Sequence, residues 1–275
     1  MIMKSEETRS KTTTTNEHTF VVCAYGTCVY LEKCVISLLN QNIQSTIIMV
    51  TSTPNDLIQS VSKKYNIPLF INEGESGITQ DWNFALSRVK TKFATIAHQD
   101  DEYKSEYTEK LLEKMNQQTC PIIGFSDYAE LHENEQRTDT KLIRVKKLML
   151  FPLRAKILQK SRFIRRRSLS LGCAICCPSV MFCLENVEQP VFKNRYTCCE
   201  DWEAWEKLSR LKGSFVYVPQ PLMSHRIHEE SVTTKTVKST GRKQEDYEMY
   251  RKFWPTWIAK MLIKRYSKAE EYNKA

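Results

Sequence analysis

The sequence is poor in glycine, with seven in 275 residues, and it forms neither of the common glycine-rich phosphate loops. Because neither G-x-G-x-x-G nor G-x-x-x-x-G-K-S/T occurs, the phosphates of a bound nucleotide would need another source of positive charge. A run of about 18 apolar residues is also missing, which argues against a transmembrane helix. Residues 1–16 are polar and threonine-rich and lack the apolar core of a signal peptide. We therefore expect a cytoplasmic protein whose residues 1–18 form a flexible tail.

The excess of positive charge is confined to one segment. The formal net charge is +9, but residues 141–167 hold eleven basic residues and no acidic one, and the rest of the chain holds 30 basic and 32 acidic residues. Within this segment basic residues alternate with bulky apolar ones such as Leu148, Phe151 and Phe163. The pattern is typical of an element on an anionic membrane surface, and equally of a solvated helix face. Because the charge is not spread over a binding face, we expect no nucleic acid partner.

Ten cysteines in a chain without a secretion signal predict reduced thiols rather than disulfides. Six of them lie between residues 173 and 199, namely Cys173, Cys176, Cys177, Cys183, Cys198 and Cys199. Zinc ligation is one interpretation, although a second Cys-x-x-Cys pair is missing. Cysteine also behaves as a small buried hydrophobe, so packing is the favoured interpretation.

Strands and helices alternate over the first hundred residues. Apolar runs predict strands at 19–25, 46–50, 68–71 and 93–97, and helical spacing predicts helices at 29–39, from Pro54 onward, and at 78–89. Short apolar runs without alternation are typical of strands buried on both faces. Strands separated by helices of this length favour a parallel sheet covered on both sides. The sequence therefore predicts an α/β protein with a Rossmann-like, mostly parallel sheet flanked by helices.

The second half is less regular. Strands are predicted at 121–125, 179–184 and 215–219, with helices at about 202–211 and from about Tyr247 onward. In α/β sheets of this kind, ligands bind beyond the carboxyl ends of the strands. The residues that follow the first strands therefore become candidates, namely Ala24-Tyr25-Gly26, Thr51-Ser52, Asn72-Glu73-Gly74 and residues 98–102.

A pair of adjacent carboxylates follows the fourth predicted strand, in His98-Gln99-Asp100-Asp101-Glu102. Neighbouring carboxylates repel each other unless a cation lies between them. Carboxylate oxygens suit Mg²⁺ and Mn²⁺, ions that often bridge to phosphate oxygens. These residues therefore predict a metal–diphosphate site. The alternative is an ordinary helix start, capped by Asp101 or Ser105, where acidic residues are common.

Several motifs, taken together and in order, resemble the family-2 glycosyltransferases of the GT-A fold. They are Ala24-Tyr25, residues 37–41, Gly77 with Asp81-Trp82-Asn83, the acidic motif at 98–102, Glu200-Asp201-Trp202-Glu203, and Arg226-x-His228 with Ser231 and Thr233. The resemblance extends from about residue 20 to 234 and is strongest to bacterial enzymes with a His-Gln-Asp-Asp motif that build surface polysaccharides. It implies the transfer of a sugar, with inversion, from a nucleotide-diphosphate donor to a hydroxyl of a glycan or lipid-linked glycan.

The resemblance also implies roles for particular residues. Asp201 is expected to be the catalytic base, with Glu200 as the rival candidate and capping of helix 202–211 as the structural alternative for Asp201. Mg²⁺ or Mn²⁺ is expected to bind Asp100, Asp101 and His228. The nucleotide-sugar donor is expected to contact Ala24, Tyr25, Thr51, Asn83, His98, Gln99 and Arg226. Two departures stand out, because the family's acidic motif usually opens with Asp rather than His98, and the second strand does not end in an acidic pair.

This interpretation divides the chain after the tail. Residues 19–240 are expected to form the glycosyltransferase domain, with a nucleotide-binding half (19–126) and an acceptor half (127–240), followed by a basic helical segment (241–275). The 141–167 stretch, with Trp254 and Trp257, suggests docking on the inner face of the plasma membrane. Two alternatives remain open: a catalytically inactive partner of an active glycosyltransferase, which the His98 departure favours, and a basic nucleic-acid-binding protein.

Overall fold

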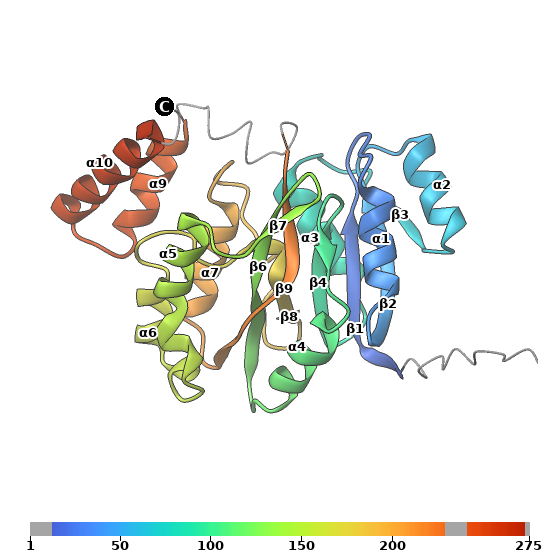
Figure 1. Cartoon of the computed structure of the whole chain (residues 1–275), viewed down its shortest axis with the longest axis horizontal. Coiled ribbons are helices and arrows are strands. Elements are labelled where there is room, and N and C mark those ends of the chain that lie inside the picture. Colours follow the sequence, from blue (N-terminus) through green and yellow to red (C-terminus); the bar gives the residue numbers. More distant parts are fainter. Residues whose placement is uncertain (1–12, 229–240, 273–275) are drawn as a thin grey trace, which may run out of the picture.

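The computed structural model describes residues 13–228 and 241–272, with side chains in the second range for 242–264. In these residues a nine-stranded sheet crosses the molecule (Figure 1) in the order β3-β2-β1-β4-β8-β6-β9-β5, and β7 pairs with β6. The strands are β1 (Thr13–Cys23), β2 (Ile43–Thr51), β3 (Leu69–Ile71), β4 (Phe93–His98), β5 (Glu102–Tyr103), β6 (Pro121–His132), β7 (Glu135–Arg137), β8 (Val180–Cys183) and β9 (Ser214–Ile227). Strands β3, β2, β1 and β4 are mutually parallel, as are β6 and β9, whereas β8 is antiparallel to both neighbours. The predicted mostly parallel sheet is confirmed.

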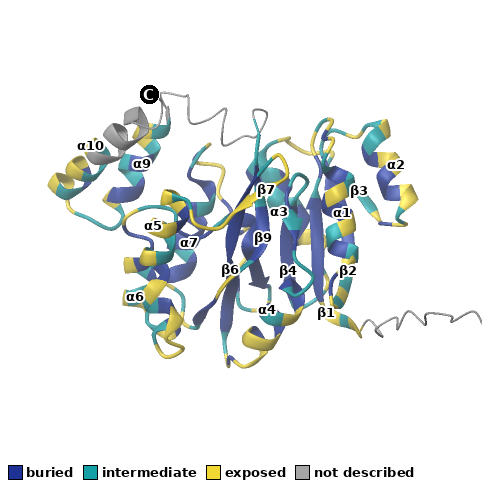
Figure 2. Cartoon of the chain, viewed as in Figure 1, coloured by how far each residue is buried: buried dark blue, intermediate teal, exposed yellow. Residues whose placement is uncertain are grey.

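Helices cover both faces of the sheet. They are α1 (Leu31–Leu39), α2 (Asp56–Lys64), α3 (Ile78–Arg88), α4 (Tyr107–Asn116), α5 (Lys141–Leu150), α6 (Arg162–Ser168), α7 (Glu200–Ser209), α9 (Gly241–Arg251) and α10 (Thr256–Tyr272). Successive side chains of a strand point to opposite faces. In β1, Phe20 and Val22 join the core formed with α1, α2 and α4, whereas Val21 between them joins α3. The strands between these layers are dark blue in Figure 2 because their side chains are buried.

Strand β1 begins earlier than predicted. Thr13 and Thr14 pair with Ile43 and Gln44 of β2, so residues 13–18 extend the sheet instead of belonging to a tail that ends at residue 18. The threonines that made this stretch look polar are β-branched, and such residues suit strands. Residues 1–12, the remainder of the predicted tail, lie outside the described residues.

Strand β9 is longer than predicted, and the C-terminal helix is divided. The apolar run of β9 is interrupted by Pro219 and Pro221, yet the strand continues to Ile227 with a shift in its register against β6. His225 and Arg226 are therefore strand residues rather than loop residues. The predicted C-terminal helix forms α9 and α10, which are separated at Pro255, as expected of a residue that cannot continue a helix.

The basic segment 141–167 forms two short helices, α5 and α6. Between α5 and α6 lie the 3₁₀ turns η1 (Phe151–Arg154) and η2 (Leu158–Lys160). Figure 1 places α5, α6, α7, α9 and α10 at one end of the sheet and β1–β3 with α1 and α2 at the other. Among the described residues, every helix is too short or too polar to cross a bilayer.

Candidate active site

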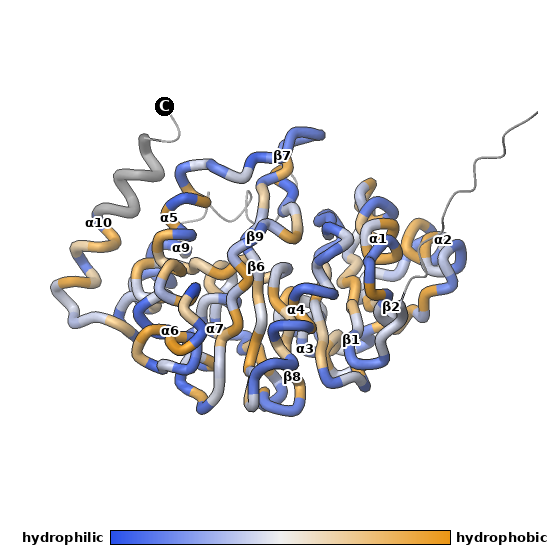
Figure 3. The backbone as a smooth tube through the Cα atoms, turned by 60° about the horizontal axis from the view of Figure 1, so that its bottom comes forward, coloured by the Kyte–Doolittle hydropathy of each residue, from blue (hydrophilic) through white to orange (hydrophobic). Residues whose placement is uncertain are grey.

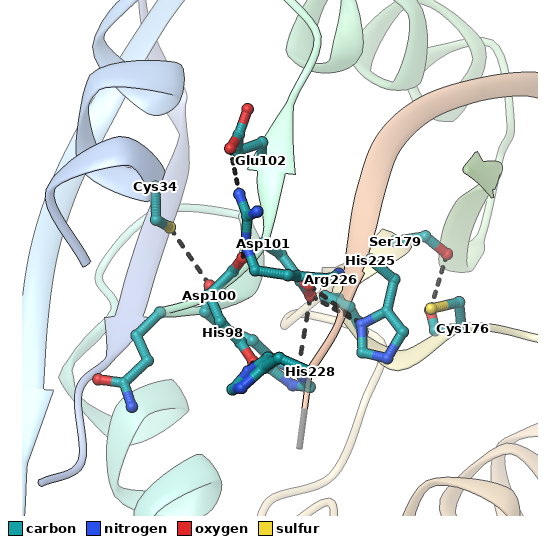
Figure 4. Close-up of polar contacts among 12 residues, drawn as sticks. Cys34, His98, Asp100, Asp101, Glu102, Cys176, Ser179, His225, Arg226 and His228 are labelled. Atoms are coloured by element: carbon teal, nitrogen blue, oxygen red, sulfur yellow. Dashed lines mark hydrogen bonds and ion pairs between the residues drawn. The ribbon is translucent and has the colours of Figure 1, made fainter. Parts of the chain in front are cut away.

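The pairing of β5 with β9 brings two distant motifs together. Strand β4 ends at His98, and after a short turn Glu102 of β5 pairs with Ser224 of β9. The acidic motif at 98–102 therefore lies against residues 225–228, which are far away in the sequence (Figure 4). Ser231 and Thr233, which belong to the same predicted motif, lie outside the described residues.

Direct contacts join the two motifs. Nε2 of His228 lies 2.9 Å from Oδ2 of Asp100. Nδ1 of His225 lies 3.0 Å from Oδ1 of Asp101, and the same oxygen accepts a 2.9 Å bond from the backbone N–H of Arg226. Each carboxylate of the predicted metal pair thus contacts a histidine, Asp101 one on β9 and Asp100 the one directly after it.

Arg226 of β9 binds the acidic motif through its side chain. Its side chain is 2% exposed, its Nε donates to the carbonyl of Asp100 at 2.9 Å, and it forms an ion pair with Glu102. A further 3.1 Å bond runs to the carbonyl of Glu133, and the guanidinium lies 4.1 Å from the centre of the Tyr30 ring. These contacts support a positioning role and do not support the predicted bond from Arg226 to a donor phosphate.

His98, Asp100 and Asp101 form a cluster suited to a divalent cation. One potential ligand atom from each lies within 4.8 Å of the others. The His98 ring stacks on Trp82 at 5.3 Å, and within the described part of the chain its buried Nε2 has no hydrogen-bond partner. Burial lowers the pKa of His98 despite the nearby carboxylates, which keeps the imidazole neutral. A neutral imidazole nitrogen together with carboxylate oxygens is a donor set that accepts Mn²⁺.

The two carboxylates of this cluster differ in exposure and charge environment. Asp101 is fully buried, and although burial works to raise the pKa of Asp101, the adjacent His225 lowers it overall. Burial works to lower the pKa of His225, but Asp101 raises it overall, so the two form a buried ion pair. Asp100 and His228 are partly exposed, with side-chain exposures of 18% and 20%. Asp101 therefore holds β9 in place, whereas the side chains of Asp100 and His228 are partly accessible to solvent.

Asp201 lies inside the first turn of α7. The helix begins at Glu200, and its N-cap is Cys199, so Asp201 is not the capping residue. The backbone N–H of Trp202 donates to Oδ1 of Asp201 at 2.6 Å, and the thiol of Cys173 donates to Oδ2 at 3.3 Å. Both oxygens are thus held by a donor, which restricts the orientation of this carboxylate.

The charges around Asp201 connect it with the metal cluster. Burial raises the pKa of Asp201, and the nearby Lys146 and His98 oppose this effect. The same His98 ring is within electrostatic reach of both metal-cluster carboxylates. Burial also raises the pKa of Glu200, to about 7, with Asp201 and Glu245 of α9 adding to the shift. Asp201 therefore interacts electrostatically with His98, whereas Glu200 interacts with Glu245 of α9.

Of the predicted donor contacts at the ends of β1 and β2, one residue is exposed and the others are buried. The backbone N–H of Tyr25 donates to Oε1 of Gln99 at 3.0 Å, and the Gln99 amide donates to the Tyr25 carbonyl at 2.8 Å. The Tyr25 side chain itself is 59% exposed at this edge. Ala24 and Thr51 are buried, and the Thr51 hydroxyl accepts a 3.0 Å bond from the backbone of Thr53. Tyr25 is therefore available to a ligand, whereas Thr51 shapes the turn.

Residues 19–188 match the sequence model of the family described as Glycosyl transferase family 2. The chain belongs to glycosyltransferase family 2. No curated protein matches the sequence. The match covers more than half of the chain and includes the second half of β1, β2 to β4, the acidic motif and β8.

Solved structures share the GT-A fold of this glycosyltransferase at low sequence identity. S. aureus TarS, residues 1–349, in complex with UDP-GlcNAc superposes with a TM-score of 0.60 at 13% identity, over 90% of this chain and 70% of that one. Mannosyltransferase PcManGT from Pyrobaculum calidifontis, in complex with GDP-Man and Mn²⁺, gives 0.60 at 11% identity, over 90% and 69%. The fold predicted from the sequence is confirmed.

This family-2 glycosyltransferase has a polar network in which Asp81, a residue without an assigned role, contacts Ser52 and Asn72, two candidates from the strand ends. Asp81 of α3 accepts bonds from the Ser52 hydroxyl at 2.7 Å and from the Asn72 amide at 2.8 Å, at the ends of β2 and β3. Its neighbour Asn83 bonds the backbone N–H and carbonyl of Phe192, at 3.0 and 2.8 Å. These contacts do not support the predicted donor contact of Asn83. The sequence signal that could have indicated a role for Asp81 is its position as an acidic residue in the first turn of α3, the helix that follows β3.

Lys146 is a second residue that the sequence did not assign to the site. It belongs to the basic segment, yet its ammonium lies 4.9 Å from the centre of the Tyr128 ring and near Asp201. Trp82, which stacks on His98, lies within the quoted Asp81-Trp82-Asn83 motif but had no assigned role. The contacts of Lys146 depend on where α5 packs, which no local pattern in the sequence reports.

Proposed function

We propose that this glycosyltransferase transfers a sugar from a nucleotide-diphosphate donor to an acceptor hydroxyl with inversion at the anomeric carbon. The observation that carries the proposal is the cluster of Asp100 and Asp101 with the imidazole of His98, which also interacts electrostatically with Asp201. This grouping combines candidate metal ligands with a candidate base in one site. The complexes of TarS with UDP-GlcNAc and of PcManGT with GDP-Man support a nucleotide-sugar donor.

The residues present fit a divalent cation. Asp100, His228 and His98 would hold Mg²⁺ or Mn²⁺, with Asp101 completing the cluster and binding β9. When bound, such an ion offsets the negative charge of the donor diphosphate and of its leaving group. The complex of PcManGT with GDP-Man and Mn²⁺ supports the choice of metal. Arg226 contacts the carbonyl of Asp100 and the side chain of Glu102, and these contacts fix the position of the acidic motif that carries the candidate ligands.

Asp201 would act as the general base. Its carboxylate takes the proton of the acceptor hydroxyl as the acceptor oxygen bonds to the anomeric carbon and the bond from that carbon to the diphosphate breaks. The bonds from Cys173 and from the backbone of Trp202 orient the carboxylate. Burial makes Asp201 a stronger base than an exposed aspartate, and Lys146 limits how far its pKa rises. Glu200 lacks these contacts and is coupled to α9.

The acceptor is proposed to be a glycan or a lipid-linked glycan in surface polysaccharide synthesis, reached from the inner face of the membrane. The motif resemblance supports this proposal. An inactive partner subunit is the second candidate, favoured by His98 in the place of the usual aspartate. The two candidates differ in whether the donor is turned over.

Titration calorimetry tests the site. UDP-GlcNAc and GDP-Man are titrated into the protein with Mn²⁺ or with EDTA, using the wild type, Asp100→Ala and the control Asp139→Ala, whose side chain is 76% exposed. We expect one donor to bind at least about tenfold more tightly with Mn²⁺, and Asp100→Ala alone to lose this gain. Equal affinities with Mn²⁺ and EDTA would refute the metal site. Proton NMR of the first product should show inversion, whereas donor binding without any turnover would favour the inactive subunit.

A further inference from the structure

Large apolar side chains are concentrated on the surface of α5, α6 and the turns between them. Among the described residues, thirteen large hydrophobic side chains are exposed, and six belong to residues 141–167. We call these six the α5–α6 face: Leu142, Val145, Leu148, Phe151, Ile157 and Phe163, with exposed fractions from 48% to 80%. Figure 2 shows exposed residues along both helices, and Figure 3 shows hydrophobic and hydrophilic residues alternating there.

Seven basic residues lie at the surface among these apolar side chains. They are Lys141, Arg144, Arg154, Lys156, Lys160, Arg162 and Arg167. The segment has no acidic residue, so the face is predominantly positive, although Asp139 outside the segment pairs with Arg144 at 3.5 Å. Arg154 and Arg167 also lie over the rings of Phe151 and Phe163, at 5.6 and 5.4 Å, which mixes cationic and apolar groups on one surface.

The other four basic residues of the segment make contacts with other parts of the protein. Arg165 donates to the carbonyl of Leu211 at 2.7 Å, and Arg166 pairs with Glu206. Lys147 donates to the carbonyl of Thr138 at 3.0 Å, and Lys146 lies over the Tyr128 ring. The segment therefore has some basic residues that are exposed to solvent and others that contact the rest of the protein.

Helix α5 separates the α5–α6 face from the active site. Ile143 and Leu150 are buried, and Lys146 lies between them at helical spacing, toward Asp201. The exposed residues Leu142, Val145 and Leu148 recur every three residues on the other side. One helix, roughly 10 Å across, thus lies between the exposed apolar stripe and the acceptor side of the site.

We propose that the α5–α6 face docks on an anionic phospholipid bilayer. Six large exposed apolar side chains within residues 141–167 are more than a solvated basic helix would present. Apolar side chains can enter the headgroup boundary while the seven cations meet anionic headgroups. A second copy of the chain would bring two faces of the same positive sign together, which opposes dimerisation through this surface. Charge complementarity therefore favours lipid over a second copy as the occupant.

Of the two tryptophans of the C-terminal segment, one packs inside the protein and the other is exposed. Trp254, which the sequence assigned to docking, donates from Nε1 to the carbonyl of Ser170 at 2.7 Å and lies against Arg167 at 4.5 Å. It packs α9 and α10 onto α6. Trp257 of α10 is 69% exposed, at the end of the molecule that holds α5 and α6 (Figure 1).

Docking would bring the acceptor side of the site close to the membrane. An acceptor hydroxyl on a lipid-anchored molecule would then reach Asp201 past α5. This consequence depends on the proposed function, whereas docking itself does not. The two can be tested separately because vesicle binding needs neither donor nor acceptor.

Vesicle sedimentation of the full chain tests the proposal. Vesicles contain phosphatidylcholine alone or mixed with phosphatidylglycerol, and no nucleotide sugar is added. We expect at least about tenfold more binding to the anionic vesicles, with a steep decrease as salt is raised. Leu148→Glu should reduce binding at least about tenfold, whereas Ile36→Glu, on an exposed helical position of α1, should not. Lys141→Gln with Lys160→Gln should reduce binding, whereas Lys33→Gln with Lys63→Gln should have little effect.

Circular dichroism melting shows whether each variant is folded, and light scattering gives its oligomeric state. Absence of binding to anionic vesicles would overturn the proposal, as would equal binding by Leu148→Glu and the wild type. A dimer that Leu148→Glu dissociates would also overturn it and would assign the face to a second copy. Donor titration with Mn²⁺ on the same samples separates this result from failure of the catalytic site.

Discussion

His98 shows how much one side chain can change the interpretation of a motif. In the resemblance it replaces the aspartate that usually opens the acidic motif, and this departure kept an inactive partner subunit open as an alternative. In the fold its imidazole stacks on Trp82 and faces the carboxylates of Asp100 and Asp101. A neutral imidazole can contribute a nitrogen ligand where an acid would contribute an oxygen. The change would therefore alter the type of ligand in the proposed metal site without removing that site.

Asp201→Asn gives the sharpest test at this scale. An amide cannot accept the hydroxyl proton, so we expect turnover to fall about 10²–10⁴-fold while donor affinity persists. Steady-state kinetics and donor titration measure the two quantities. Because the base must be ionised, the rate should decline as the pH falls through the raised pKa of Asp201.

Glu200→Gln is the matched control for that variant. Glu200 lies next to Asp201 in the same helical turn, but it is coupled to Glu245 rather than to His98. We expect it to keep most of the activity. Equal losses in the two variants, or unchanged turnover in Asp201→Asn, would remove the assigned role of Asp201.

At the scale of elements, the site depends on the pairing of β5 with β9. The run 93–97 and the acidic motif after it could be predicted because both are local in the sequence. The continuation of β9 past Pro219 and Pro221 could not, because prolines normally interrupt a strand and only the register with β6 shows that the strand resumes. Arg226 was therefore expected at a ligand phosphate, whereas its contacts bind two elements together.

Asn83→Ala tests whether α3 serves stability or donor binding. The substitution leaves the backbone N–H and carbonyl of Phe192 without their partner, so we expect the free energy of unfolding to fall by about 1–3 kcal/mol. Donor affinity should stay unchanged. Urea denaturation and calorimetry measure these quantities. Ser87→Ala, at an exposed position of the same helix, should change stability by less than about 0.5 kcal/mol. Weaker donor binding at unchanged stability would instead favour the donor contact first predicted for Asn83.

At the scale of the whole molecule, the helical layers enclose polar groups as well as apolar ones. His18 of β1 is fully buried, with Nδ1 at 2.8 Å from the Ser45 hydroxyl and Nε2 at 3.0 Å from the Thr95 hydroxyl. Burial lowers the pKa of His18 to about 3. The sequence predicted a flexible tail up to this residue, and only the pairing of β1 with its two neighbours places it in the interior.

His18 should make folding stability depend on pH. Below its ordinary pKa of about 6.5, the unfolded chain binds a proton that the folded protein does not, so the free energy of unfolding falls as the pH falls. The contribution amounts to about 3 kcal/mol between pH 6.5 and pH 4, and ends near the folded pKa. Urea denaturation between pH 7 and pH 4 gives the free energy of unfolding at each pH. This free energy should change less with pH in His18→Gln than in the wild type. An equal change in the two proteins would contradict this account.

The sequence by itself determined the family, the alternation of strands and helices and the position of the carboxylates after β4. These features are local, because apolar periodicity and motifs involve residues that are close together in the sequence. Only the tertiary structure decided which carboxylate faces which histidine, and which basic residues of α5 and α6 point inward. Asp101 is committed to His225 and Asp100 to His228 through contacts that join residues more than a hundred positions apart. Such contacts depend on strand order and register, which no local pattern of residues specifies.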